Sequence, residues 1–325
     1  MKFPLSSFVV LIALVGLLSP ALAQHKEDHS YPLYSYLTAK ENPGRMICYT
    51  PAELDPRNEA NQGKLLTSSI RADLAALRPA FDGLVLYGYH EQCTPRVLGV
   101  AKELGYRAVL LAIWNPKSTN EIDGVAALAR QYDGKLVMGV LVGNEGITFK
   151  RYELEDLAIA EQRIRPLLPK NVPISTSEPL HGYTNDVILK FGEFCCPNIH
   201  PVFDRKDLAA EKAAAWTREE AAKIAKRAGK AVLVKETGFP HAGNAMYTPT
   251  SQSEYWHHYT AAGTIAVIDD KPTAPVWVSH GIGFEAFDLP WKSQESKLEI
   301  EKSWGLLDPK RQPHPAFRVW KELAE

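Results

Sequence analysis

The sequence predicts an α/β fold, a single-domain (β/α)8 TIM barrel, on three observations. Short apolar segments alternate with helical patterns from Arg45 to the C-terminus, which is typical of a parallel sheet with right-handed crossovers. Eight such units within about 280 residues suit a closed barrel better than an open doubly wound sheet. The first strand-to-helix turn contains no GxGxxG motif, which argues against a dinucleotide-binding domain.

The predicted strands are short and rich in Val, Ile, Leu and aromatic residues. Most show no polar alternation, as expected of strands that are buried on both faces. In chain order they are 46–50, 83–89, 108–114, 136–143, 172–177, 195–200, 231–236 and 281–287.

The predicted helices follow the strands, and spacing and end signals define them. Apolar residues at spacings of four and three predict a helix over 66–77, because this spacing places them on one face. Thr94 and Pro95 supply the N-cap and the N1 proline of the next helix, which Gly105 ends. The remaining helices are predicted at 118–133, 153–168, 184–191, 207–228, 251–268 and 315–323.

The N-terminus has the pattern of a signal peptide over residues 1–23. Lys2 precedes an apolar run at 8–18 that is short for a membrane span, and a small-residue site ends at Ala23. We expect cleavage there, secretion to the periplasm or the extracellular medium, and no membrane span afterwards; a retained membrane anchor is the alternative. Residues 24–44 are expected to be a polar leader to the domain at 45–325.

Charge and cysteine content limit the kinds of binding partner and the number of disulfides that the chain is expected to have. The 37 basic and 38 acidic residues give a net charge of −1, so nothing favours nucleic acid or an anionic membrane. No cofactor or metal is implied, and nothing demands more than a monomer. Four cysteines are too few for a disulfide scaffold. Cys48 and Cys93 could form a pair or remain buried thiols, and the adjacent Cys195 and Cys196 would rarely bridge each other.

Two glutamates end predicted strands four and seven. Glu145 follows Asn144 after an apolar run, and Glu236 precedes Thr237. Catalytic groups of such barrels lie at the C-terminal strand ends, and strands four and seven face each other across the barrel. Both carboxylates should therefore enter one pocket, as glycosidic bond cleavage requires: one donates a proton and the other attacks or activates water. Two unrelated strand-end glutamates are the alternative.

Strand-end aromatic residues would complete a sugar site, because the C–H faces of sugar rings stack on aromatic rings. Most aromatic residues of a barrel belong to its core, and among the candidates we favour Trp114 and Trp291 as sugar-binding residues. The full set of aromatic candidates is Tyr87, Trp114, Phe203, Phe284, Phe287 and Trp291.

The motifs around these residues resemble glycoside hydrolase family 17. VGNE, which ends at Glu145, and KETGFP, which contains Glu236, are similar to the strand-four and strand-seven signatures of that family. The likeness spans about Arg45 to His314. It continues in order through ICYTP, VLYGYHEQC, VLGVAKELGYRAVLLAIW, TSEP, FEAFDLPWK and EKSWGLLDPKRQPHP.

The resemblance implies a retaining glycosidase that acts on a β-1,3-glucan or its oligosaccharides. Glu145 would be the acid/base, and Glu236 the nucleophile that forms a covalent glycosyl-enzyme. Asn144 would hydrogen-bond the sugar 2-hydroxyl, and the two carboxyl groups would lie roughly 5–5.5 Å apart. Further sugar-hydroxyl contacts are implied after strand eight, from Glu285, Asp288 and Lys292.

Two positions depart from the family pattern. Related sequences typically show Arg-x-Tyr on strand two, where this chain has Val85-Leu86-Tyr87, and Tyr-Pro on strand six, where it has His200-Pro201. A tyrosine at the second place would orient the nucleophile, and the sequence leaves open whether the imidazole N–H of His200 does so instead. The departures leave the reaction type intact and bear on linkage and subsite preference.

Three other functions compete with hydrolysis. A transglycosylase would pass the glycosyl-enzyme to another glucan rather than to water, and a non-catalytic glucan-binding envelope protein would use the same cleft. The sequence does not separate hydrolysis from transfer. A metal-dependent barrel hydrolase lacks its usual strand-one His-x-His here. It would draw on the strand-end histidines His181, His200, His241 and His280.

Overall fold

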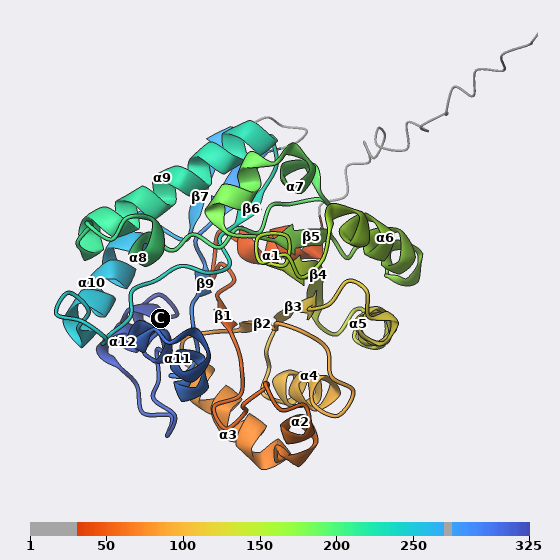
Figure 1. The fold of residues 1–325 in the computed structure, drawn as a ribbon, viewed down its shortest axis with the longest axis horizontal. Helices are drawn as coiled ribbons and strands as arrows, with labels where there is room; N and C mark the ends of the chain where they lie inside the picture. Colours follow the sequence, from red (N-terminus) through yellow and green to blue (C-terminus); the bar gives the residue numbers. More distant parts are fainter. Residues whose placement is uncertain (1–30, 270–274) are drawn as a thin grey trace, which may run out of the picture.

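The computed structural model describes residues 31–269 and 275–325. The expected signal peptide and residues 24–30 of the expected leader lie outside this part of the chain. Figure 1 shows the strands at the centre with helices arranged around them. Among the described residues, no helix has the length and apolar character needed to cross a membrane.

Six parallel strands form one curved sheet in the order β5-β4-β3-β2-β1-β9. Met46 lies opposite both Gly83 and Ile282, so the first strand sits between the second and the last. The strands are β1 (Met46–Cys48), β2 (Gly83–Val85), β3 (Ala108–Ile113), β4 (Val137–Asn144), β5 (Ile174–Ser177) and β9 (Ile282–Gly283).

A second group of strands closes the barrel. β6 (Val232–Leu233) pairs in parallel with β8 (Val276–Ser279), which runs on into β9. The predicted sixth strand forms isolated bridges to its neighbours rather than a continuous ladder. Cys195 pairs with Val232, and Asn198 pairs with both Pro179 and Glu236. The eight predicted strand positions therefore form a TIM-barrel-like α/β fold.

One expected helix is too long. The helix predicted at 251–268 is α10 (Pro249–Thr260), and β7 (Ile265–Asp269) follows it, antiparallel to β8. Gly263 takes a φ of 83°, a left-handed conformation that stops the helix. The Ile-Ala-Val-Ile run after it is rich in β-branched residues, which favour a strand.

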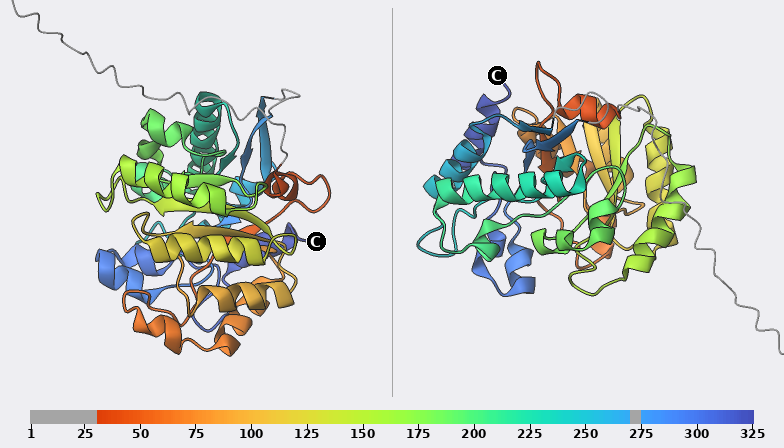
Figure 2. Two further views of the ribbon diagram at one scale, coloured as in Figure 1. Left: turned by 90° about the vertical axis from the view of Figure 1, so that its right-hand side faces the viewer. Right: turned by 90° about the horizontal axis from the view of Figure 1, so that it is seen from above.

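The other predicted helices are present, mostly one to a few residues shorter. Ser118 caps α5 by accepting a 3.2 Å hydrogen bond from the Glu121 amide, and Gly229 ends α9 with a φ of 66°. Figure 2 shows α5 (yellow) and α9 (teal) on the outside of the strands. These helices are α3 (Thr67–Leu77), α4 (Thr94–Glu103), α5 (Thr119–Gln131), α6 (Leu154–Ile164), α7 (Asp186–Lys190), α9 (Ala210–Ala228) and α12 (Pro315–Glu322).

Shorter helices lie in the connections. They are α2 (Ala60–Lys64), α8 (Pro201–Asp204), α11 (Pro290–Ser296) and the 3₁₀ turns η1 (Arg165–Leu167), η2 (Leu180–Thr184) and η3 (Glu299–Lys302).

The described part of the expected polar leader, residues 31–44, packs on the barrel. It forms α1 (Pro32–Leu37), whose Leu33 and Leu37 are fully buried. A Cβ at Gly139 would lie 2.8 Å from a methyl of Leu33, so the helix sits directly on the start of β4. The Tyr36 hydroxyl donates a 2.6 Å hydrogen bond to Asp82, just before β2. This helix therefore covers the N-terminal end of the barrel.

The four cysteines are buried free thiols. All four are buried and none forms a disulfide, so Cys48 and Cys93 do not pair. Burial raises the pKa of the Cys196 thiol to about 12, which makes it unreactive.

Candidate active site

The C-terminal strand ends open into a cavity of about 1240 Å³. The volume suits an oligosaccharide better than a single sugar. The cavity brings together both predicted glutamates and most of the residues predicted to bind substrate. Its lining includes Tyr87, Trp114, Asn144, Glu145, His200, Glu236, Glu285, Trp291 and Lys292.

Glu236 is held as a carboxylate at the end of the seventh strand position. Its side chain is buried, with Oε1 2.9 Å from the Lys235 ammonium and Oε2 3.4 Å from Nε2 of His200. Burial acts to raise its pKa, but Lys235 and His200 outweigh burial and hold the pKa well below its ordinary value. The imidazole of His200 thus lies beside this carboxylate, at the position where related sequences typically show a tyrosine.

Glu145 has the opposite electrostatic surroundings. Its backbone takes a φ of 53°, and its amide donates a 2.7 Å hydrogen bond to the Ser177 carbonyl on β5. Burial and, after it, the negative charge of Glu236 raise the pKa of this carboxyl. Two carboxyl groups of one cavity thus have pKa values pushed apart, which is how one site holds both an acid and an ionised nucleophile.

Sequence reasoning missed Asn198. This buried residue accepts a 3.1 Å hydrogen bond from the Ser177 hydroxyl and donates one of 2.8 Å to Oε1 of Glu145. Because the serine fixes the amide oxygen, the amide nitrogen is directed at Glu145. A polar residue two places before His200, within an otherwise apolar segment, was the signal that could have identified it.

Lys235 was missed as well. It is 1% exposed, pairs with Glu236, donates a hydrogen bond to Oδ1 of Asn144 and lies 4.9 Å from the centre of the Tyr87 ring. At the strand-two position where related sequences typically show Arg, this chain has the buried Val85. The cation beside the Glu236 carboxylate is therefore Lys235, which comes from the same strand position as Glu236.

Residues 46–305 match the family model of the BtgE/BtgC glycoside hydrolase domain. The chain belongs to that family. The resemblance to glycoside hydrolases inferred from the strand-four and strand-seven motifs is thereby confirmed.

Similar curated proteins include two from Aspergillus fumigatus. A probable glucan endo-1,3-beta-glucosidase btgC of Aspergillus fumigatus is 24% identical over 279 residues, covering 78% of this chain and 40% of the relative. A probable beta-glucosidase btgE of the same species is 26% identical over 252 residues, covering 74% of this chain and 42% of the relative. The chain thus spans about two fifths of the length of these relatives.

Solved structures share the fold. A glycoside hydrolase family 17 beta-1,3-glucanosyltransferase from Rhizomucor miehei matches with a TM-score of 0.64 and 19% identity, covering 85% of this chain and 97% of that one. An active-site mutant of that enzyme in complex with laminaritriose matches with a TM-score of 0.63 and 18% identity, covering 84% and 96%. A GH5_18 protein from Streptomyces cattleya matches with a TM-score of 0.60 and 16% identity, covering 86% and 79%.

The strand-eight residues of this glycoside hydrolase domain separate into two groups. Glu285 and Lys292 line the cavity and form a 2.8 Å hydrogen bond. Burial raises the pKa of Glu285 to about 7, with Lys292 opposing the change and the charge of Glu301 adding to it. Asp288, expected to contact sugar, is not part of the cavity lining.

Asp288 instead joins three segments. Its carboxylate accepts hydrogen bonds from Nε2 of His241 at 3.0 Å, Nε2 of His314 at 2.9 Å and the Gly305 amide at 3.0 Å. Asp288 was predicted to contact sugar because it follows strand eight, but its side chain points toward the C-terminal segment. Asp288, His241 and His314 form what we call the Asp288 cluster. Within the described residues it is the group whose ligand atoms could hold a metal ion.

The four histidines considered for a metal-dependent hydrolase do not meet. His200 lies beside Glu236, His241 belongs to the Asp288 cluster, and His280 is buried against the Tyr259 hydroxyl at 2.9 Å. His181 lies on the cavity wall. A metal site built from these four residues is therefore wrong.

The aromatic candidates differ in exposure. Trp114 is 42% exposed with Arg151 at 4.1 Å over its ring, and Phe203 is 38% exposed. Trp291 is half-buried, with Arg57 at 5.9 Å. Phe284 lines the cavity but is buried, and Phe287 is a core residue. Trp114 and Phe203 therefore offer ring surface to a ligand, and Phe287 does not.

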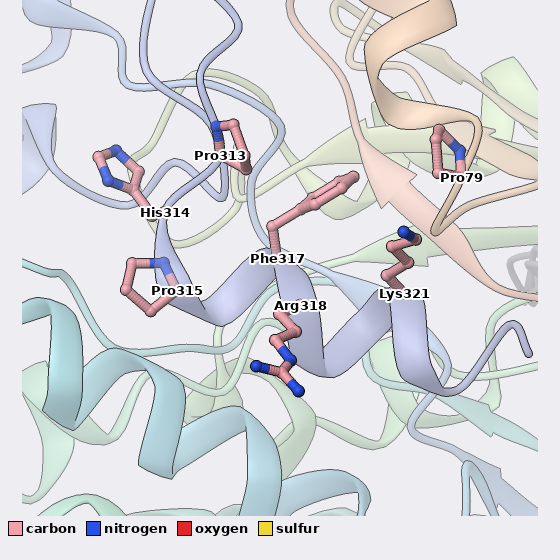
Figure 3. A pocket seen from close by; sticks show the side chains of 7 residues that line it. All are labelled: Pro79, Pro313, His314, Pro315, Phe317, Arg318 and Lys321. Carbon is pink, nitrogen blue, oxygen red and sulfur yellow. The ribbon is translucent and has the colours of Figure 1, made fainter.

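A second hollow, of about 450 Å³, lies around the start of α12 (Figure 3). None of its lining residues is acidic, so it offers no paired carboxylates. They are Pro79, Pro313, His314, Pro315, Phe317, Arg318 and Lys321.

Proposed function

We propose that this chain is a retaining glycosidase that acts on β-1,3-glucan through a covalent glycosyl-enzyme. The observation that carries the proposal is the pair Glu145 and Glu236, which share one cavity and have pKa shifts of opposite direction. The relatives named as glucan endo-1,3-beta-glucosidases support the choice of glucan.

The proposed mechanism is a double displacement. Glu145 donates its proton to the glycosidic oxygen while the Glu236 carboxylate attacks the anomeric carbon, so the leaving sugar departs as an alcohol. Glu145, now a carboxylate, then takes a proton from the incoming hydroxyl, which attacks the anomeric carbon and releases Glu236. Two inversions retain the anomeric configuration.

The incoming hydroxyl decides between hydrolysis and transfer. Trp114, Phe149 and Phe203 line the cavity and are 42%, 64% and 38% exposed, which gives an acceptor sugar apolar surface on which to stack. This surface favours transglycosylation as the second candidate. The fold of a family 17 glucanosyltransferase is in keeping with it.

Product analysis tests both candidates. The purified protein is incubated with a β-1,3-linked glucan oligosaccharide beside the variant Glu236→Ala. Shorter products that the variant does not form identify a hydrolase, and longer or branched products that it does not form identify a transglycosylase. If wild type and variant bind the oligosaccharide and are equally inert, the chain is a glucan-binding protein and the catalytic proposal fails.

Export belongs to the same proposal. The apolar run and the small-residue site at Ala23 support a cleaved signal peptide and secretion. We infer that the secreted protein is a monomer that acts on cell-wall glucan. The N-terminus of the protein recovered outside the cytoplasm should be Gln24, which mass spectrometry of its N-terminal peptide can show. A protein that keeps Met1 and stays with the membrane would contradict this.

A further inference from the structure

Lys235 is a buried charge that the double displacement leaves without a role. Its side chain is 1% exposed, and an isolated ammonium in such a place would be costly. Its backbone amide donates a 2.9 Å hydrogen bond to the Pro197 carbonyl, which fixes where the side chain starts. The ammonium meets Oε1 of Glu236, Oδ1 of Asn144 and the face of the Tyr87 ring.

We propose that Lys235 is the positioning residue of this site, and that its ammonium fixes the Glu236 carboxylate and the Asn144 amide relative to each other. The proposal rests on the function proposed above. It adds a residue that none of the sequence motifs singled out for a role.

The amide of Asn144 shows the first effect. An ammonium can only donate hydrogen bonds, so the Asn144 atom that it contacts must be the oxygen. The amide nitrogen is then free to point elsewhere, and Asn144 lines the cavity. Lys235 therefore selects the amide orientation in which Asn144 presents N–H groups to a sugar hydroxyl.

The second effect of Lys235 is on the charge of the Glu236 carboxylate. A full charge 2.9 Å away in a buried site stabilises the ionised form strongly. His200 adds to this at 3.4 Å, but the charge of an imidazole depends on pH. Burial acts to lower the pKa of Lys235, but the charge and hydrogen bond of Glu236, together with the neighbouring Cys48 and Cys196, raise it above its usual value, so the ammonium stays charged.

The test compares Lys235→Met with Lys230→Met. Methionine keeps the length of the side chain and removes the charge. Lys230 is a matched control, because its ammonium lies just before β6 and donates to the Phe191 and Gly192 carbonyls at 2.9 and 3.1 Å, away from the cavity. Activity requires ionised Glu236, so the acid limb of the kcat/KM profile should move to higher pH by about one to three units in Lys235→Met. In Lys230→Met it should stay in place.

A second readout does not need activity. The side-chain carboxyl of Glu236, labelled with carbon-13 and assigned through Glu236→Gln, is titrated by NMR in wild type and in both lysine variants. Its pKa should rise in Lys235→Met alone. If Lys235→Met does not fold, Lys235→Gln takes its place, since it also lacks the charge but keeps a donor toward Asn144.

The outcomes separate the two proposals. An unchanged acid limb and an unchanged Glu236 titration in the folded, uncharged variant would overturn the role of Lys235, and a merely structural lysine would give this result. A wild type without activity on the glucan would overturn the proposed function. The NMR titration would then still decide what Lys235 does to Glu236.

Discussion

At the scale of single residues, the cavity separates the protonation states of two glutamates. Lys235 and His200 lie within 3.4 Å of Glu236, while Glu145 has Asn198 as its hydrogen-bond donor. Burial affects both carboxyl groups, so the difference arises from neighbours rather than from depth. The proposed roles, an ionised nucleophile and a protonated acid, require such a difference.

The raised pKa of Glu145 predicts a basic limb in the pH profile. Activity requires the protonated acid, so it should fall as pH rises through that pKa. Glu145→Gln should lose about 10²–10⁴-fold in kcat/KM, which reports the glycosylation step, on a glucan oligosaccharide. It should lose far less on an aryl glycoside whose leaving group needs no proton, and the basic limb should disappear. Steady-state kinetics across pH measure all three. An equal loss on both substrates would contradict the acid role.

At the scale of elements, the Asp288 cluster connects the loops after strands seven and eight to the C-terminal segment. His241 follows the Glu236 strand, and His314 precedes α12. Their hydrogen bonds outweigh burial and lower the pKa of Asp288, so it is a carboxylate at neutral pH. The stabilisation is present above the unfolded-state pKa of an aspartate and is lost as pH falls through the lower folded-state value.

Asp288→Ala should lower the free energy of unfolding by about 3 kcal/mol, because it leaves three donors without their acceptor. Urea unfolding at neutral pH measures the loss. Glu254→Ala, at an exposed site of α10, is the control and should stay within about 0.5 kcal/mol of wild type. A loss that persists undiminished in strong acid would contradict the electrostatic origin.

The helix α1 is a second element whose contribution can be measured. Leu33 is fully buried against β4, so Leu33→Ala should cost about 2–5 kcal/mol of unfolding free energy through lost burial and a cavity. Ser35→Ala changes an exposed position of the same helix and should change little. Equal stability of the two variants would show that this helix is dispensable to the domain.

At the scale of the whole molecule, the barrel brings distant segments to one cavity. Cavity residues run from Tyr49 to Trp304, so ligand binding should stabilise the folded domain as a unit. For the inactive Glu236→Ala, a β-1,3-linked oligosaccharide at about 100 times its Kd should add about 2.7 kcal/mol to the free energy of unfolding. Thermal unfolding measures this gain. A maltooligosaccharide is the control, and an equal gain with it would contradict the linkage preference.

The sequence determined the fold class and the strand-end position of the two glutamates, because both signals are local. Apolar periodicity marks a buried strand wherever the strand packs, and a polar residue at a strand end marks the rim of a barrel. Glu145 and Glu236 could be paired from strand order alone. The same reasoning overextended at 251–268, where a glycine and β-branched residues turned a helical pattern into a strand.

Tertiary structure alone decided which polar side chains meet. Asn198 and Lys235 lie within apolar segments, and only barrel closure directs one at Glu145 and brings the other to Asn144. Asp288 looked equivalent to Glu285 along the chain, yet the fold turns it toward two histidines. Residue type and strand position can be read from local sequence. The partner of a buried charge depends on contacts between segments far apart in the chain, which no local pattern encodes.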